Sequence, residues 1–569
     1  MAEPQRAGLD WSGVLLVGGI ALLAALAGLR NEFAQDDLYL IQENVRIHDL
    51  GNWREMLNSP FWPSPYSQDL YRPLTSLLLS LEFALGGGSP LVFRLFSYLC
   101  YAAVAAGVFV LASRLLPRSI ALAVGMLFAA HPVHVEAVAL GVGQSELIVG
   151  LLALGMGLFY LDRRRRGALR PRDWALLAGL YLTAGLFKEQ GVVLPACLLA
   201  VELFLCTGSP GERFRRLLPG YGLLAGTALL LLLLRRVALG GELAGTFTAE
   251  ALVGLTLYGR TLTMLTVVPH WARLLLWPAH LQGDYSPQEL VASTGFGGGE
   301  VVGLLLLLAA LAALWLARRR APVLSFGLAW CAVALLPVSN LLLPTGIVLA
   351  ERTLFLPSIG VVLGLGALLA VLAGPAVQRP LWKQPVVGLL CGVLVLAGVL
   401  RSSERQGTWR NDAVFAVRGV GDAPRSFRMR RAYAEVLFEL GRRDQALEAY
   451  QQAIALSPRG QAWRVRNDLA RRLRALGESS AEAEQLRASL AEEPAQEETR
   501  GYLIAAVLAL GRYAEAAAEA DSALARGATP QVFGALRRLA DSAARVGAAP
   551  GAIRIRINAG PSRPIRPGG

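Results

Sequence analysis

Long runs of apolar residues dominate the chain between residues 12 and 400, and they constrain its fold more than any other feature. Of the 569 residues, 54% are hydrophobic and only 17% are charged, whereas soluble globular proteins carry about 25% charged residues. A helix of about 20 apolar residues crosses a bilayer, and many of the runs approach this length. The sequence therefore predicts an all-α, polytopic membrane protein. A secreted enzyme, a cytosolic enzyme and a disordered protein are excluded.

Eleven apolar runs are predicted to cross the membrane. They are residues 12–29, 89–113, 118–135, 143–161, 173–187, 191–207, 217–234, 301–317, 321–340, 355–374 and 385–400. Together they define a membrane domain over residues 1–400. Segment 252–278 is more polar, and we interpret it as interfacial or re-entrant. The one long loop, 30–88, follows the first span and is rich in acidic and aromatic residues, among them Trp53, Trp62 and Tyr66.

Arginine clusters between the runs predict the orientation of the chain, because cytoplasmic loops are enriched in Arg and Lys. The clusters at 163–166, 213–216 and 318–320, with Arg379 and Lys383, fall on the same side as the N-terminus. That side is therefore predicted to be cytoplasmic, with loop 30–88 and everything after residue 400 outside. Only Arg235 and Arg236 disagree. The net charge of +13 thus reflects membrane topology, not a nucleic-acid partner. The Ala-, Leu- and Arg-rich composition favours a bacterial cell membrane, with a periplasmic C-terminal part.

A repeated pattern replaces the apolar runs after residue 400. Residues 401–423 are interpreted as a linker, and 424–546 as helical repeats. Prolines recur at intervals of about 34 to 36 residues, at positions 424, 458, 494 and 530, and Leu-Gly pairs recur at 440–441, 476–477 and 510–511. This period resembles that of tetratricopeptide repeats, and it predicts a short α-solenoid. The Gly-, Pro- and Arg-rich tail, 547–569, is predicted to be disordered.

Two adjacent aspartates, Asp36 and Asp37, follow the first predicted span. Neighbouring carboxylates repel each other and favour a shared proton or a cation. One of them can serve as a general base toward a hydroxyl group, or the pair can help to hold a divalent metal such as Mg²⁺ or Mn²⁺. A solvated loop start is the alternative interpretation.

Polar residues also lie between the third and fourth predicted spans, in "AAHPVHVEAVALGVGQSELIVG". Ionisable groups near bilayer depth are costly and are therefore functional candidates. The spacing of His131, His134 and Glu136 is compatible with zinc ligation. A hydrogen-bonded corner between two helices is the alternative, and we favour it.

Two further charged pairs occur within apolar sequence, Lys188-Glu189 and Glu351-Arg352. Lysine can bind a phosphate as a point charge, and arginine can bind it through two hydrogen bonds. The alternatives are a lysine that snorkels to the interface beside its neighbour and a buried structural ion pair.

Weaker candidates are Arg72, Asp284 and Tyr285, which lie in "YRPLTSL" and "LLLWPAHLQGDYS". No convincing phosphate-binding glycine loop and no nucleophile elbow appear in the sequence. Energy from cytosolic ATP is therefore not indicated.

Taken in order, these segments resemble one family. The chain is similar to the transmembrane-and-tetratricopeptide-repeat-containing O-mannosyltransferases, within the polyprenyl-phosphate-sugar-dependent glycosyltransferases of the GT-C fold. The resemblance rests on seven blocks in order: "QDDLYLIQENVRIHD", "YRPLTSL", "HPVHVEAVALGVGQSEL", "KEQG", "LLLWPAHLQGDYS", "SNLLLPTGIVLAERTLFLPSIG" and the C-terminal repeats. The family's Arg-Ala-Asp or Arg-Ser-Asp after the His-Pro block is here Gly143-Gln144-Ser145-Glu146, so Glu146 is assigned no role.

The resemblance implies an inverting transferase that takes a sugar, mannose in this family, from a polyprenyl-phosphate carrier on the non-cytoplasmic face. It implies that Asp36 and Asp37 are catalytic, and that Lys188, Arg352 and Arg72 bind the donor phosphate. The residues expected to support the site or to contact sugar or acceptor are His131, His134, Glu136, Glu189, Glu351, Asp284 and Tyr285. The expected acceptor is a protein or glycan hydroxyl, with the repeats as a docking surface.

Three other functions remain open. One is a transferase of the same architecture that acts on a lipid or a glycan. Another is a non-enzymatic scaffold or assembly factor for envelope proteins or polysaccharide, in which the repeats are the working part. The third is a transporter, which ranks last because residues 1–400 show no convincing internal symmetry of the kind that transporters have.

Overall fold

The computed structural model describes residues 9–553 and 555, except 65, 67, 68, 242–247 and 375–384. Within these residues every regular element is a helix, which confirms the all-α prediction. The chain divides into two compact units. The first, called the membrane unit here, comprises residues up to 285 and 292–418; the second, the repeat unit, comprises 286–291 and residues from 419 on.

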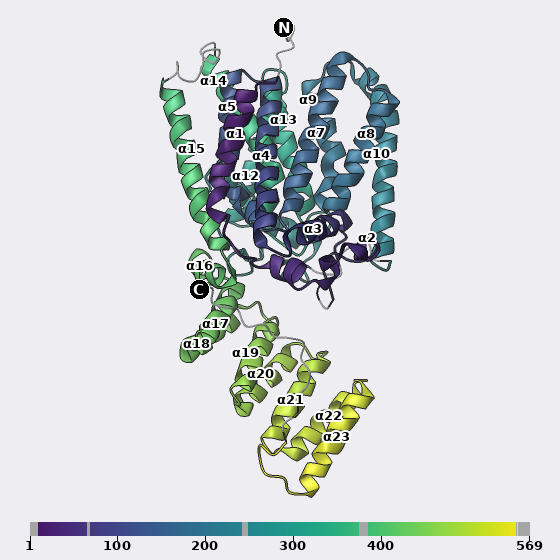
Figure 1. Cartoon of the computed structure of the whole chain (residues 1–569), viewed down its shortest axis with the longest axis vertical. Helices are drawn as coiled ribbons and strands as arrows, with labels where there is room; N and C mark the ends of the chain where they lie inside the picture. The colour runs from purple at the N-terminus through teal and green to yellow at the C-terminus, as the bar shows by residue number, and fades with distance from the viewer. Residues whose placement is uncertain are drawn as a thin grey trace. The chain divides into compact units, whose positions relative to one another are not determined.

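Seven helices in the described part of the chain are long and apolar enough to cross a membrane. They are α1 (Trp11–Ala25), α4 (Pro90–Leu115), α7 (Gln144–Arg166), α10 (Pro210–Ala238), α12 (Gly298–Ala317), α14 (Phe355–Ala373) and α15 (Pro385–Gln406). The helix α5 (Arg118–Ala129) and the segment Pro132–Ala139 meet the same criterion together, as one span with a bend of 44°. Figure 1 shows these helices packed side by side.

The three other predicted spans coincide with helices too short to meet this criterion. They are α8 (Pro171–Phe187), α9 (Leu194–Leu205) and α13 (Pro322–Leu335), with 17, 12 and 14 residues. Two of the predicted runs continue past the helix ends into 3₁₀ turns, within Glu189–Val193 before α9 and at Leu336–Val338 after α13. The runs 191–207 and 321–340 are therefore longer than α9 and α13, whereas α8 begins before the predicted run 173–187.

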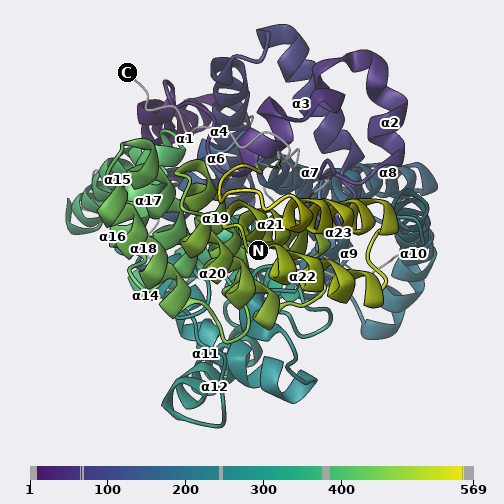
Figure 2. The ribbon, with the colours of Figure 1, turned by 90° about the horizontal axis from the view of Figure 1, so that it is seen from below.

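Segment 252–278 contains one continuous helix, α11 (Leu257–Leu276), which packs against α12. Figure 2 shows both helices at the edge of the membrane unit. The helix carries Arg260 and Arg273 and is not among the apolar candidates. The segment therefore lacks the break of a re-entrant loop, and its predicted interfacial position stays a prediction.

Loop 30–88 folds into short helical pieces that include α2 (Trp53–Asn58) and α3 (Pro73–Gly86). Both lie across one end of the spanning helices (Figure 1). The loop has its own apolar cluster, formed by Phe33, Leu40, Ile41, Ile47, Met56, Phe61 and Leu79 together with Phe93 of α4. This cluster fixes the loop that carries Asp36 and Asp37.

The contact between α13 and α14 also positions a site residue, because α14 begins just after the turn that carries Arg352. A Cβ atom added to Gly327 would lie 2.4 Å from the carbonyl oxygen of Gly360, and one added to Gly360 would lie 2.4 Å from that of Gly327.

We expect Gly327→Ala to lower the free energy of unfolding by about 1–3 kcal/mol through overpacking. Thermal unfolding in detergent would show this, with Gly155→Ala in α7 as the matched control, where an added Cβ meets no atom within 4 Å. Equal melting temperatures for the two variants would contradict the expectation.

The repeat unit contains three successive helical hairpins and a final helix. They are formed by α17 (Phe427–Glu439) with α18 (Arg443–Leu456), α19 (Trp463–Ala475) with α20 (Ser479–Glu492), α21 (Glu497–Ala509) with α22 (Tyr513–Ala525), and then α23 (Pro530–Arg545). Each hairpin turns at the glycine of a repeated Leu-Gly pair: Gly441, Gly477 and Gly511 have φ values of 71°, 78° and 74°. These are left-handed conformations that favour glycine.

The segments that flank the predicted repeats have structure of their own. Residues 401–423 form the end of α15, a 3₁₀ turn and α16 (Asp412–Asp422). Asp412 accepts hydrogen bonds from the backbone and side chain of Gln35, at 2.6 and 2.9 Å, so this part of the predicted linker belongs to the membrane unit. Of the predicted tail, residues 554 and 556–569 lie outside the described residues.

Candidate functional site

Asp36 and Asp37 begin a short helical stretch that runs through Gln42, and their side chains have different surroundings. The Asp37 carboxylate is fully buried and accepts hydrogen bonds from the backbone amides of Gly141 and Val142, at 2.8 and 2.9 Å. Burial raises the pKa of Asp37 to about 6, against the opposing effects of Arg94 and the two amides. Asp36 keeps a side chain that is 36% exposed. Asp36 is therefore the carboxylate of the pair that a ligand can reach.

Arg94 is the residue that holds Asp37 in place. Its side chain is fully buried in α4, with Nη1 3.5 Å from Asp37 Oδ2. The guanidinium also donates to the carbonyl oxygens of Glu32, at 2.7 Å, and Ala139. Arg94 thus ties the segment before Asp36 to the segment before Gly141. Arg94 was not predicted from the sequence, although it is the only charged residue in the apolar run 89–113.

Asp36 lies beside Arg352, whose Nη2 is 3.9 Å from Asp36 Oδ2. Arg352 is held from the other side by Glu136: its backbone amide donates to Oε2 at 2.8 Å, and its Nη1 donates to Oε1. The Arg352 side chain remains 24% exposed. The structure therefore brings together three residues predicted from distant parts of the sequence, and Glu136 orients the arginine.

Lys188 and Arg72 extend this group of cations. Lys188 Nζ lies 2.7 Å from Glu146 Oε1. Burial lowers the pKa of Lys188, and the nearby charges of Arg72 and Arg352 act in the same direction while Glu146 opposes them. The three cations therefore lie around a common region. Glu146, to which the sequence analysis assigned no role, is the partner of the lysine.

Glu189 joins Arg72 to a further arginine. Arg72 donates from Nε to both carboxylate oxygens of Glu189, at 2.9 and 3.2 Å, and its Nη2 lies 2.8 Å from Oε2. Arg235, in the last turn of α10, has Nη1 3.7 Å from Glu189 Oε1. We call Arg352, Lys188, Arg72 and Arg235 the cationic row. Arg235 was not predicted as a site residue, and its place here accounts for a cation that disagreed with the predicted topology.

The two histidines lie in a hydrogen-bonded corner. His134 is 1% exposed; its Nδ1 pairs with the Tyr101 hydroxyl at 3.0 Å and its Nε2 with Ser358 Oγ at 2.9 Å. His131 Nε2 pairs with the carbonyl oxygen of Leu275 at 3.1 Å. Both imidazole rings therefore hold neighbouring segments together through hydrogen bonds. Glu136 binds Arg352 and not the histidines.

Metal ligation gains no support from the arrangement of these groups. Among the described residues no group of three His, Cys, Asp or Glu side chains is placed to hold a metal ion. Each Asp37 oxygen accepts one amide hydrogen bond and keeps a second lone pair. A divalent cation shared by Asp36 and Asp37 therefore stays a prediction.

Glu351 points away from its neighbour Arg352. Its buried carboxylate accepts from the backbone amide of Gln282 at 2.5 Å and from the hydroxyl of Tyr285 at 3.0 Å, and it lies 3.7 Å from Arg405. Asp284, beside Tyr285, is half-buried. Through these contacts Glu351 joins the segment after α11 to Arg405 of α15. They hold the backbone next to Arg352 in place.

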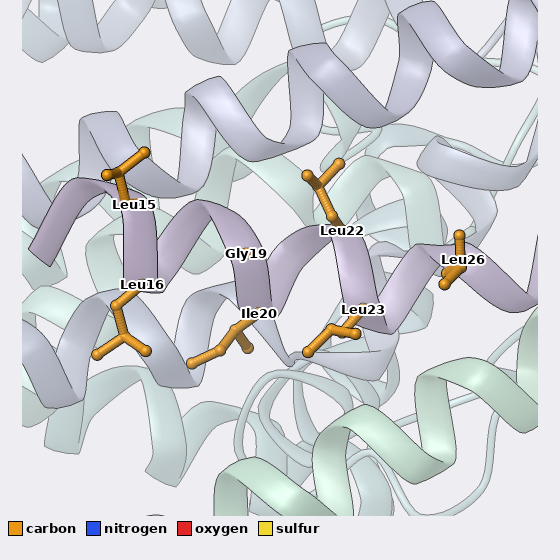
Figure 3. Close-up of a pocket in the computed structure, with 7 residues that line it drawn as sticks. All are labelled: Leu15, Leu16, Gly19, Ile20, Leu22, Leu23 and Leu26. Atoms are coloured by element: carbon orange, nitrogen blue, oxygen red, sulfur yellow. The ribbon is translucent and has the colours of Figure 1, made fainter. Parts of the chain in front are cut away.

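A shallow apolar groove runs along α1, away from these charged groups. Figure 3 shows its lining, which consists of Leu15, Leu16, Gly19, Ile20, Leu22, Leu23 and Leu26. No lining residue has a polar side chain, and all come from one predicted span. The groove is therefore interpreted as membrane-facing surface and not as part of the site.

The chain is similar to known protein O-mannosyl-transferases. It is 28% identical over 393 residues to Protein O-mannosyl-transferase TMTC3 of Mus musculus, covering 63% of this chain and 42% of that protein. It is 29% identical over 507 residues to Tmtc1 of Drosophila melanogaster, covering 71% and 57%, and 27% identical over 461 residues to TMTC4 of Mus musculus, covering 70% and 60%. The chain thus spans between 42% and 60% of the length of these relatives. No protein-family model and no solved structure matches it. The resemblance predicted from the sequence is confirmed.

Proposed function

We propose that this chain, a relative of the TMTC protein O-mannosyl-transferases, is a membrane glycosyltransferase that moves mannose from a polyprenyl-phosphate carrier to a hydroxyl group of a protein. The observation that carries the proposal is the exposed Asp36 carboxylate beside the cationic row. A lipid-linked donor requires cations for its phosphate and a base for the acceptor, and both are present at one end of the spanning helices.

The proposed reaction is a single displacement with inversion. Asp36 takes the proton of the acceptor hydroxyl, the acceptor oxygen forms a bond to the anomeric carbon, and the bond from that carbon to the phosphate oxygen breaks. The electron pair leaves with the polyprenyl phosphate. Arg352, Lys188 and Arg72 stabilise the charge of the departing phosphate, as preorganised cations do in other transferases. General base catalysis contributes about 10²–10⁴-fold to such a step.

Asp37 has a different proposed role. Its two oxygens are occupied by backbone amides and its charge is compensated by Arg94. It therefore positions Asp36 without touching the substrate. This assignment separates two neighbours that the sequence alone left equivalent.

We further propose that the site faces the non-cytoplasmic side. In support, α7 carries Glu146 in its first turn and Arg163–Arg166 in its last turn, so the site and the arginine cluster lie at opposite ends of one spanning helix. Clusters of this kind mark the cytoplasmic side. In a bacterial cell membrane the site would then be periplasmic, and the repeat unit would offer a surface for the acceptor.

Replacing Arg72 with glutamine tests the phosphate assignment. A hydrogen bond to a charged group contributes about 1.5–3 kcal/mol, so we expect KM for the lipid-linked sugar to rise about 10- to 100-fold, with a smaller change in kcat. Arg54→Gln is the matched control, because Arg54 lies in the same loop with an exposed side chain. Steady-state transfer at varied donor concentration measures both constants. An unchanged KM in Arg72→Gln would contradict the assignment.

A further inference from the structure

Four aromatic rings of loop 30–88 form a continuous row. The ring centroids of Tyr39 and Tyr66 are 5.0 Å apart, those of Tyr66 and Trp62 are 6.0 Å apart, and those of Trp62 and Phe61 are 6.5 Å apart. Tyr66 is 37% exposed, and Tyr39 and Trp62 are half-buried. We call these residues the aromatic row. Its members come from two separate stretches of the loop, so it is made by tertiary folding.

The row connects the proposed base to the proposed phosphate-binding cations. Tyr39 follows Asp36 by three residues in the short helical stretch that runs through Gln42, so this end of the row lies close to Asp36 along the chain. At the other end, the guanidinium of Arg72 lies over the Phe61 ring, with Cζ 5.2 Å from the centroid. The aromatic row therefore extends from the residue that would activate the acceptor to a residue that would hold the phosphate.

Arg46 fixes the segment that carries half of this row. Its Nη1 donates to Ser59 Oγ at 2.7 Å, and its Nη2 donates to the carbonyl oxygens of Pro60 and Phe61 at 2.9 and 3.0 Å. The backbone amide of Phe61 also donates to the carbonyl oxygen of Leu70 at 2.7 Å. The rings are thus held before any ligand arrives, and a preorganised surface binds with a smaller entropic cost.

We propose that the aromatic row binds the hexose ring of the lipid-linked donor by stacking. This inference rests on the function proposed above. A hexose has a face of C–H groups, which suits the electron-rich face of an aromatic ring. The sugar would then lie between Asp36 and Arg72, with its phosphate at the cationic row.

The contrast with Trp53 favours sugar binding over anchoring in the bilayer interface. Tryptophan and tyrosine are common at membrane interfaces, and Trp53 is 47% exposed in the same loop. The guanidinium of the neighbouring Arg54 lies over its ring, with Cζ 5.1 Å from the centroid, and Trp53 is not a member of the aromatic row. Trp53 therefore provides a matched control for an interfacial role.

The test compares two probes of the same chain length, polyprenyl-phosphate mannose and polyprenyl phosphate, which lacks the sugar and carries a more negative phosphate. Binding of each to the purified full-length protein in detergent is measured for the wild type, Trp62→Leu and Trp53→Leu. We expect Trp62→Leu to weaken binding of the sugar-bearing lipid about three- to tenfold, the range for an aromatic contact, without changing that of polyprenyl phosphate. Trp53→Leu should change neither. Because Trp62 packs on the apolar cluster of the loop, Tyr66→Leu serves as a second variant with the same expected result.

Two results would overturn the proposal. If the wild type binds both lipids but Trp62→Leu and Tyr66→Leu keep the wild-type ratio of affinities, the aromatic row does not hold the sugar, and the glycosyltransferase proposal stands. If the wild type binds neither lipid, the donor assignment itself fails, and the inference fails with it.

Discussion

Replacing Asp36 with asparagine is expected to lower kcat for sugar transfer by about 10²–10⁴-fold, the contribution of a general base. The substitution keeps the size of the side chain and removes its ability to take a proton. The Asp36 side chain is 36% exposed and lies 3.9 Å from Arg352 Nη2, at the long end of the range for an ion pair, so the fold should not depend on its charge. Donor binding should therefore remain close to that of the wild type while transfer is lost. Turnover of labelled lipid-linked sugar measures kcat, and a separate binding experiment measures the affinity for the donor.

Glu32→Gln is the matched control for this variant. Glu32 lies four residues earlier in the same segment, and its side chain is exposed. The same change of charge there should leave kcat within about twofold of the wild type, as expected for a surface substitution of about ±0.5 kcal/mol. Wild-type turnover in Asp36→Asn would refute its role as the base.

Breaking the buried pair of Arg94 and Asp37 is expected to have the largest effect on stability. Removing one partner of a buried ion pair leaves an uncompensated charge and costs about 3–5 kcal/mol. We therefore expect Arg94→Gln and Asp37→Asn each to lower the free energy of unfolding by about this amount. The double variant should lose less than the sum of the two, because neither charge is then left alone. Unfolding of the purified protein in detergent, followed for all four proteins, measures this coupling.

The same double variant separates positioning from catalysis at Asp37. If Asp37 only holds the loop, the double variant should recover part of the activity lost in Asp37→Asn. Arg114→Gln is the control: Arg114 lies in the same helix and pairs with Asp162 at 2.8 Å, but the two side chains are 41% and 30% exposed. An exposed pair contributes about 0–1 kcal/mol. Strictly additive losses, with no recovery of activity, would contradict a positioning role.

The architecture was predictable from the sequence because burial in lipid imposes a strong pattern. Every predicted span coincides with a helix, and the Leu-Gly pairs mark the turns of the helical hairpins. The lengths of α9 and α13 were not predictable in the same way. Apolar residues continue beyond both helices into 3₁₀ turns, at residues 191–193 before α9 and at Leu336–Val338 after α13, so hydropathy alone could not place these ends.

The site was predictable in its residues but not in its pairings. Lys188 and Glu189 are neighbours in the sequence, yet they bind Glu146 and Arg72 respectively. The backbone of Lys188 is extended, with φ −159° and ψ 146°, and side chains alternate in direction along extended backbone. Glu351 and Arg352 begin a 3₁₀ turn, which has three residues per turn, so their side chains also point in different directions, toward Tyr285 and Glu136. Glu136 and Arg352 are 216 positions apart, and no local sequence pattern predicts that two such distant residues form a pair.

The most direct test of the central claim is transfer by the purified full-length protein from polyprenyl-phosphate mannose, labelled in the sugar, to proteins of its native membrane. The proposal predicts that label appears on protein, that polyprenyl phosphate is released in equal amount, and that both signals disappear in Asp36→Asn. Glucosyl and other hexosyl donors, run in parallel, would identify the preferred sugar. Absence of transfer from every donor in the presence of native acceptors, or equal transfer by Asp36→Asn, would contradict the proposal. A scaffold that acts through its repeat unit would then be the better account.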